Sequence, residues 1–407
     1  MAVDLLSPQA LATVLISAVS LIVWRLTVGG FGSRKYKLPP LVEYKWPILG
    51  STFDFIKDPT AFTVNSYEKY GPVFRVYFRG YVQAVVGKEH VRDIFLNPAF
   101  SYELIPVYKD FAASIGHFVN RKSPVLALLP SVAKLYMWTR STALNTHHRV
   151  KFNLSSPTAV YRAKVLKYTM PIVHERRRLM KELGDEYDPP AYLNTVPLDQ
   201  PVNEHELATM MLTLVFFSIH TTTKRTTICL YNLAKYPQYV PELLEEQRAV
   251  LGDDWADGTV TLDQLKNLNK LDSFIRESLR TSGRSIALPH KIVGMDEWHL
   301  PGGYVLPKGT VVNINTEDVY YSPELQGPNP REFNAWRFVG TDKGAARIGP
   351  DMIAFGLGRH ACPGRFFAVH EMKIALSLIL KRYSVTFPDG VKPTDGSPLL
   401  FTPRKTA

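Results

Sequence analysis

One short segment near the C-terminal end concentrates residue types that can bind a metal-containing group. The segment Phe-Gly-Leu-Gly-Arg-His-Ala-Cys-Pro-Gly runs from Phe355 to Gly364, and its single cysteine is Cys362. Glycines at Gly356 and Gly358 let the backbone turn tightly and approach a flat ligand closely. A helical pattern follows the cysteine, and the N-terminus of a helix stabilises a nearby thiolate. The segment therefore predicts a thiolate that ligates a metal.

Two other interpretations of Cys362 are open. A lone cysteine in a cytosolic enzyme is most often an inert, small apolar residue. A zinc site would combine Cys362 with His360 and His370, but this spacing is not typical of structural zinc and the chain lacks a second cysteine pair. The other cysteine, Cys229, falls in an apolar helical stretch, so we expect it to be buried filler and expect no structural disulfide.

A carboxylate and a guanidinium occur three residues apart in Glu277-Ser-Leu-Arg280. This spacing places both side chains on one face of a helix, where such a pair is most often an exposed ion pair that stabilises little. A further arginine, Arg337, ends the run Phe-Asn-Ala-Trp-Arg. These three residues become informative only in combination with the cysteine segment.

Polar residues interrupt an otherwise apolar helical pattern in Phe-Ser-Ile-His-Thr-Thr-Thr, which ends at Thr223. In one interpretation the hydroxyl groups donate to carbonyls of the preceding turn and have no further role. In the other, His220, Thr221 and Thr222 handle protons in a reaction. The sequence around them predicts one long buried helix from residue 203 to about 235.

Together these segments resemble the cytochrome P-450 superfamily, whose heme loop is Phe-x-x-Gly-x-Arg-x-Cys-x-Gly. Four positions match that pattern: Phe355, Gly358, Cys362 and Gly364. His360 replaces the arginine that usually holds a heme propionate, and a histidine can also donate a hydrogen bond. The resemblance implies heme b with Cys362 as the axial iron ligand, a thiolate that favours O–O cleavage.

The resemblance also assigns roles to the other two groups. It implies that Glu277, Arg280 and Arg337 form a buried triad that locks the fold behind the heme, although Ala335 and Trp336 replace the more usual Pro-Glu.

For the long helix, the resemblance implies a kinked dioxygen site formed by the family's Ala/Gly-Gly-x-Asp/Glu-Thr-Thr motif. Thr221 would orient water, Thr222 would be the second threonine, and His220 would replace the usual acid as a proton donor or gate. His290 would hold a propionate, and residues 285–288 would line the pocket above the heme. The His-Thr-Thr sequence is similar to that of fungal secondary-metabolism members, including ent-kaurene oxidase-like enzymes.

The N-terminal region predicts a membrane anchor. Residues from Ala10 to Trp24 carry no charge, and with the preceding leucines the stretch approaches the length of a spanning helix. A secretory signal is the alternative, but its basic residues would precede the apolar run, whereas here Arg25 and Lys35 follow it. Positive charge on this flank keeps it cytoplasmic. We expect a single-pass protein of the endoplasmic reticulum membrane whose catalytic domain faces the cytosol.

The expected organisation is an anchor over residues 1–27, a basic and proline-rich linker over 28–50, and a heme-thiolate catalytic domain over 51–407. The expected fold is mainly α with a small antiparallel β portion, in the cytochrome P-450 arrangement. Residues 100–202 match the family poorly, because the region is short and lacks a Trp-x-x-x-Arg helix. Trp138 and Arg140 are wrongly spaced for that motif, so we expect the distal helices to be incomplete.

The net charge of +11 raises the question of nucleic-acid binding. Such proteins gather Lys and Arg on one element with interleaved aromatics, and this chain does not, so we expect no nucleic-acid partner. The densest basic run, residues 174–178, suits a solvated helix face. Basic residues near Cys362, such as Arg365, would instead attract an acidic redox partner. The expected partners are NADPH-cytochrome P-450 reductase and, in addition, cytochrome b5.

The sequence thus predicts a membrane-bound monooxygenase that hydroxylates or oxidises an apolar metabolite, with a terpenoid favoured, using heme, O₂ and electrons from NADPH through the reductase. The alternative is a non-catalytic, truncated heme-binding or scaffold remnant of the same family.

Overall fold

The computed structural model describes residues 36–46, 49–78, 81–102, 157–184, 204–253, 260–282, 285–394 and 396–404. The chain divides into one compact unit of residues 1–103 and 225–407 and a second of residues 104–224. The predicted anchor lies outside the described residues, as do Trp138 and Arg140. Within the described ranges, the helices are too short or too polar to cross a membrane.

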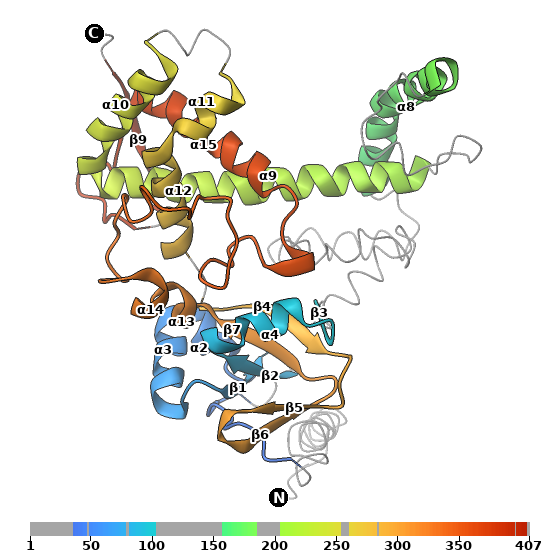
Figure 1. Ribbon diagram of the computed structural model, residues 1–407, viewed down its shortest axis with the longest axis vertical. Coiled ribbons are helices and arrows are strands. Elements are labelled where there is room, and N and C mark those ends of the chain that lie inside the picture. Colours follow the sequence, from blue (N-terminus) through green and yellow to red (C-terminus); the bar gives the residue numbers. More distant parts are fainter. Residues whose placement is uncertain are drawn as a thin grey trace, which may run out of the picture. The chain divides into compact units, whose positions relative to one another are not determined.

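A five-stranded sheet forms one part of the first unit (Figure 1). In spatial order its strands are β1 (Phe74–Phe78), β2 (Tyr81–Val86), β7 (Val311–Asn315), β4 (Ile286–Ile292) and β3 (Phe100–Tyr102). Strands β1 and β2 pair antiparallel, with Phe74 opposite Val85. However, β2 and β7 pair in parallel, with Ala84 opposite Val312. The expectation of a purely antiparallel β portion was therefore wrong. A parallel pair joins distant segments through a long crossover, which local turn signals do not reveal.

Several short helices lie near this sheet, and two smaller strand pairs complete the β portion of the chain that the structure describes. The helices near it are α2 (Thr52–Lys57), α3 (Pro59–Tyr70), η1 (Lys88–His90), α4 (Val91–Leu96), α13 (Thr316–Tyr320) and α14 (Pro323–Gln326). Two further strand pairs are antiparallel: β5 (Glu297–Leu300) with β6 (Tyr304–Pro307), and β8 (Tyr383–Thr386) with β9 (Leu400–Pro403). The turn between β5 and β6 contains Gly302 at φ +78°, as the Pro-Gly-Gly sequence predicts.

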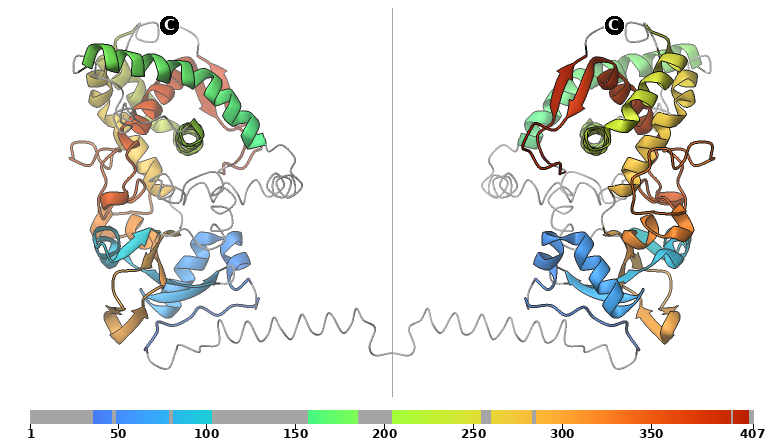
Figure 2. Two further views of the ribbon diagram at one scale, coloured as in Figure 1. Left: turned by 90° about the vertical axis from the view of Figure 1, so that its right-hand side faces the viewer. Right: turned by 90° about the vertical axis from the view of Figure 1, so that its left-hand side faces the viewer.

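A group of packed helices forms the other part of the first unit, and Figure 2 shows it from two sides. Its members are α10 (Val240–Leu251), α11 (Leu262–Asn267), α12 (Asn269–Thr281) and α15 (Arg365–Arg382). Gly252 ends α10 at φ +86°, and Thr261 with Gln264 forms a capping box before α11. Helix α12 is buried from Ser273 to Arg280 because it packs against both α10 and α15.

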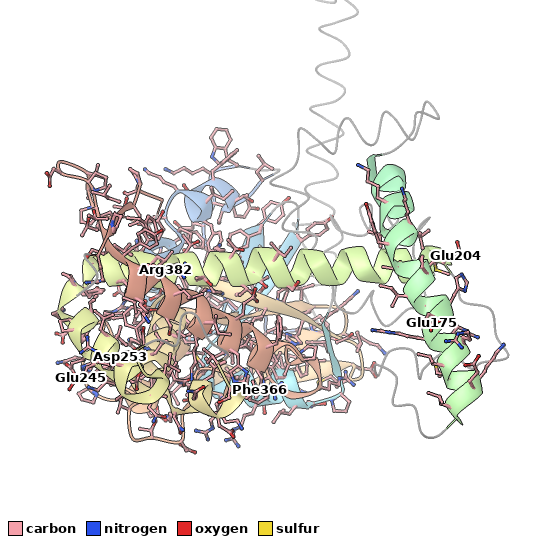
Figure 3. The ribbon with its side chains drawn as sticks, turned by 90° about the horizontal axis from the view of Figure 1, so that it is seen from above. Glu175, Glu204, Glu245, Asp253, Phe366 and Arg382 are labelled. Carbon is pink, nitrogen blue, oxygen red and sulfur yellow. The ribbon has the colours of Figure 1, made fainter. Side chains whose placement is uncertain are left out.

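The long helix α9 (Glu204–Lys235) confirms the predicted extent of the helix, but Ile219 is 55% exposed, so the expectation that it is buried throughout was wrong. The boundary between the two units falls after Lys224, within this helix. Figure 3 labels Glu204 in its first turn, and α8 (Pro157–Leu183) is the other described helix of the second unit. The densest basic run lies on α8, where Arg178 pairs with Glu175 and Glu182 on an exposed face. Cys229 of α9 is fully buried, and burial raises the pKa of its thiol to about 12. Cys229 is thus the inert filler that its apolar surroundings predict.

The core of the first unit provides a first test of this arrangement. Phe274 of α12 is fully buried, with its ring edge-to-face against Phe333 at 5.6 Å. We expect Phe274→Ala to lower the free energy of unfolding by about 3–5 kcal/mol, because it removes buried apolar area and leaves a cavity. Leu262→Ala removes a 61% exposed side chain from the neighbouring helix and should cost less than about 0.5 kcal/mol. Denaturant titration of both variants measures the difference, and equal losses would contradict it.

Candidate functional site

The cysteine loop (residues 353–364) is closed by backbone hydrogen bonds. The amide of Cys362 donates to the carbonyl of Phe355 at 2.8 Å, so the chain folds back on itself across the loop. Smaller turns lie on either side, where Gly356 donates to Ile353 at 3.0 Å and Ala361 donates to Gly358 at 3.1 Å. The shape of the loop around the cysteine is therefore set by main-chain bonds.

Two glycines make this loop possible. Gly356 and Gly358 adopt φ values of +73° and +64°, which side chains with a Cβ rarely tolerate. At Gly358 a Cβ atom would also lie 2.7 Å from the carbonyl oxygen of Phe95. Phe95 belongs to α4, so this glycine lets the loop pack directly on that helix. The spacing of glycines in the sequence reflects both requirements.

The thiol of Cys362 lies directly before α15, whose first turn begins at Arg365. The residue is partly exposed, in contrast to Cys229. Arg365 donates from Nη1 to the carbonyl of Cys362 at 3.1 Å, which ties the cysteine to the first turn of the helix. In Figure 3, Phe366 and Arg382 mark the two ends of α15. The arrangement presents one accessible thiol from a fixed turn at a helix N-terminus.

Glu277, Arg280 and Arg337 lie together in the interior of the first unit. Both oxygens of Glu277 accept from Arg280, from Nη2 at 2.7 Å and from Nε at 2.8 Å. Arg337 donates from Nε to the same carboxylate at 3.2 Å. The side chains of Glu277 and Arg280 are fully buried, and that of Arg337 is 8% exposed. The interpretation of Glu277 and Arg280 as an exposed surface pair is therefore wrong.

The two guanidinium groups also hold the chain that follows α14. Arg337 donates from Nη1 and Nη2 to four backbone carbonyls, those of Gln326, Pro328, Asn329 and Glu332, at 3.0–3.1 Å. Arg280 donates to the carbonyl of Pro330 at 2.7 Å. Because a buried charge is costly unless it is paired and hydrogen-bonded, this network couples the triad to the fold of the segment between α14 and Arg337.

The remaining predicted residues are placed as follows. His290 is fully buried on β4, with Nδ1 2.8 Å from the carbonyl oxygen of Leu288 and its ring 4.7 Å from that of Phe95. His360 ends the 3₁₀ turn η8 (Gly358–His360), and its side chain lies outside the described residues, as does that of His220.

Thr221 and Thr222 lie on α9, where Thr221 is exposed and Thr222 is buried. Both belong to the second unit, whereas Cys362 belongs to the first. The segment expected to line a pocket, residues 285–288, mostly belongs to strand β4. The pairing of β4 with β7 shifts register after Ala287, and Leu288 adopts φ +59°. The zinc interpretation requires His360, whose side chain lies outside the described residues; among the side chains that are described, no group of three metal-ligating residues is present.

Sequence reasoning missed two charged residues of α12 that contact the chain leading to the cysteine loop. Arg276 is 1% exposed and donates from Nη1 to the carbonyls of Gly344 and Arg347. Asp272 accepts from the amide of Ala345 at 2.6 Å. The available signal was their helical spacing, since positions 272, 276 and 280 share one face of a helix that is otherwise apolar inward.

Comparisons with known proteins agree with these observations. The family model described as Cytochrome P-450 matches residues 117–407. Cytochrome P-450 monooxygenase 103 of Postia placenta is 31% identical over 68% of this chain and 53% of its own length. Cytochrome P-450 monooxygenase calE of Penicillium decumbens is 32% identical over 54% of this chain and 44% of its own length. The chain thus spans about half the length of these curated relatives.

A solved structure shows the same fold. Retinoic-acid-bound cyanobacterial CYP120A1 is similar with a TM-score of 0.59 and 18% sequence identity, over 91% of this chain and 100% of the other. The likeness supports a cytochrome P-450 fold with helices and small sheets.

The buried triad gives a second test. Glu277→Ala would leave two guanidinium groups buried without their carboxylate, so we expect a loss of about 3–5 kcal/mol in the free energy of unfolding. The matched control is Glu182→Ala, which removes an exposed carboxylate that pairs with Arg178 on α8. Because exposed pairs contribute little, the control should unfold at the wild-type denaturant concentration. A wild-type midpoint for Glu277→Ala would show that the triad is not required for stability.

Proposed function

This chain belongs to the cytochrome P-450 family, and we propose that it is a membrane-bound heme-thiolate monooxygenase that hydroxylates or oxidises an apolar metabolite. The observation that carries the proposal is the cysteine loop, which holds one partly exposed thiol at the N-terminus of α15. The family implies heme as the cofactor and a reductase as the electron donor.

The residues of the loop fit a heme. A thiolate is a heme-iron ligand, and Cys362 offers it from a turn fixed by its own amide and carbonyl. A Cβ atom on Gly364 would lie 4.0 Å from Sγ, which is an ordinary van der Waals contact. Phe355 and Gly358 belong to the same closed loop.

Bound heme supplies the activation of O₂ that lets one oxygen atom enter the substrate. The chain's own residues would hold the cofactor and deliver protons. Cys362 would hold the iron, and His290 and His360 would donate to the propionates. Thr221 and Thr222 would orient water on α9, with His220 as proton donor or gate.

For the substrate we propose an apolar secondary metabolite, with a terpenoid favoured. Its support is the His-Thr-Thr sequence at 220–222 and the similarity to monooxygenases of Postia placenta and Penicillium decumbens. For the electron donor we propose NADPH-cytochrome P-450 reductase, with cytochrome b5 as a second partner. Its support is the net charge of +11 and Arg365 beside the cysteine, which would attract acidic surfaces.

The proposed location is the endoplasmic reticulum membrane, with residues 1–27 as anchor and the catalytic domain in the cytosol. We expect the full chain to stay in the membrane pellet after alkaline carbonate extraction, because an apolar helix of this length is effectively irreversibly inserted. A chain lacking residues 1–27 should move mainly to the supernatant, apart from protein held by its basic surface, which high salt releases. Equal extraction of the full and shortened chains would contradict an N-terminal anchor.

The carbon monoxide difference spectrum of the reduced protein tests heme ligation by Cys362. We expect the wild-type protein to show the Soret band at the thiolate-ligated position. Cys362→Ser should abolish this band, because an alcohol does not replace a thiolate as a ligand. The matched control is Cys229→Ala, which removes the only other thiol from a buried site and should keep the band.

The outcomes separate the two functions that the sequence left open. A thiolate-type spectrum in the wild-type protein, followed by substrate-dependent NADPH consumption with the reductase, supports the monooxygenase. A protein that binds heme without this band, or binds none, would contradict the enzyme and favour the heme-binding or scaffold remnant.

A further inference from the structure

Asp272 of α12 contacts the chain on both sides of the cysteine loop. Its Oδ2 accepts from the amide of Ala345 at 2.6 Å, upstream of the loop. Its Oδ1 lies 2.8 Å from Nζ of Lys373, downstream of the loop on α15. A single carboxylate thus joins the two ends of the segment that carries Cys362.

The upstream contact is a close approach between backbone and carboxylate. A Cβ atom on Gly344 would lie 3.2 Å from Oδ2 of Asp272, a tight contact that would require the carboxylate to shift slightly. Arg276, one helical turn further along α12, donates to the carbonyls of Gly344 and Arg347 at 2.9 and 3.0 Å. It also pairs with Asp351 at 3.2 Å. The segment of chain that precedes the cysteine loop is therefore bound to α12 over several residues.

The downstream contact is buried. Lys373 is 3% exposed, and its ammonium group also donates to the carbonyl of Leu265 at 2.8 Å. This lysine lies in the middle of α15, three helical turns beyond Cys362. Because α15 is rigid and Arg365 ties its first turn to the carbonyl of Cys362, fixing Lys373 fixes the direction from which the cysteine is presented.

We propose that Asp272 is a positioning residue for Cys362, which sets where the thiolate is held by fixing the entering chain with one oxygen and α15 with the other. The proposal rests on the proposed ligation of heme by Cys362. Asp272 acts through Ala345 and Lys373 and does not contact the cysteine. Its contribution lies in geometry, because the two contacts constrain a loop whose own hydrogen bonds fix its shape but not its placement.

This role differs from a general contribution to stability in what it predicts. A charge-assisted hydrogen bond to a buried group holds the local chain more strongly than a neutral one. Its loss should therefore open residues 344–362 locally, before the rest of the unit unfolds. An ion pair that only stabilises the fold would change exchange throughout the unit.

Asp272→Asn tests the role, because the amide keeps the size of the side chain and one acceptor but removes the charge. We expect hydrogen–deuterium exchange in peptides over residues 344–362 to become about tenfold faster or more, with peptides of the five-stranded sheet unchanged. In the reduced, carbon monoxide-bound holoprotein we expect the thiolate-ligated band to fall relative to the band without thiolate ligation.

The matched control is Lys270→Met. Lys270 lies on the same helix and pairs at 2.7 Å with Glu242 of α10, so it tests an ion pair of α12 that does not touch the cysteine segment. This control should leave both the exchange of residues 344–362 and the thiolate-ligated band unchanged. If Asp272→Asn exchanges like the control, or if both bands are unaltered while exchange rises, the positioning role is wrong.

A second pair of variants covers the case in which Asp272→Asn does not fold. Lys373→Met should speed exchange in the residues between Cys362 and Lys373, and Lys373→Arg should restore the wild-type pattern by keeping the cation. No change in Lys373→Met would overturn the proposal. The exchange measurement needs no heme, so it separates failure of this inference from failure of the proposed heme ligation.

Discussion

The burial of Glu277 is the constraint on which much of the first unit depends. A carboxylate with no exposure to water is stable only if its charge is neutralised and its oxygens accept hydrogen bonds. Arg280 meets part of this requirement from the same helix, and Arg337 meets the rest from a distant segment. Each arginine then has further donors to satisfy, and these reach backbone carbonyls between α13 and Arg337. One buried charge thereby organises a stretch of chain that has little regular secondary structure.

The same logic extends along α12. Four ionisable side chains of this helix act in two pairs: Asp272 with Arg276, and Glu277 with Arg280. The first two hold the chain before the cysteine loop, and the last two hold the chain after α14. Apolar residues such as Phe274 pack the helix into the core, but apolar contacts are not directional. The charged groups determine how the neighbouring segments are oriented against α12, because hydrogen bonds to a buried charge allow few geometries.

The sequence predicted elements well where one local rule determines the structure. The length of α9 follows from the apolar helical pattern of its own residues. The cysteine loop could also be recognised in the sequence, because Gly356 and Gly358 adopt positive φ values that favour glycine. The parallel pairing of β2 with β7 was missed, because backbone hydrogen bonds between distant strands require no particular residue type that the sequence would show. Asp272 and Lys373 were missed because each is an ordinary helix residue until the fold brings them together.

The two cysteines show that residue type alone does not determine what a residue can do. Cys229 and Cys362 are chemically identical, yet Cys229 is fully buried, which raises the pKa of its thiol, and Cys362 lies partly exposed in a fixed turn. The described contacts that fix Cys362 all come from the first unit, whereas Thr221 and Thr222 belong to the second. The proposed iron ligand and the proposed proton-handling residues therefore come from different units of the chain. Since the described contacts of Cys362 are made by the first unit itself, we expect a substitution at Thr221 or Thr222 to leave the position of the thiol unchanged.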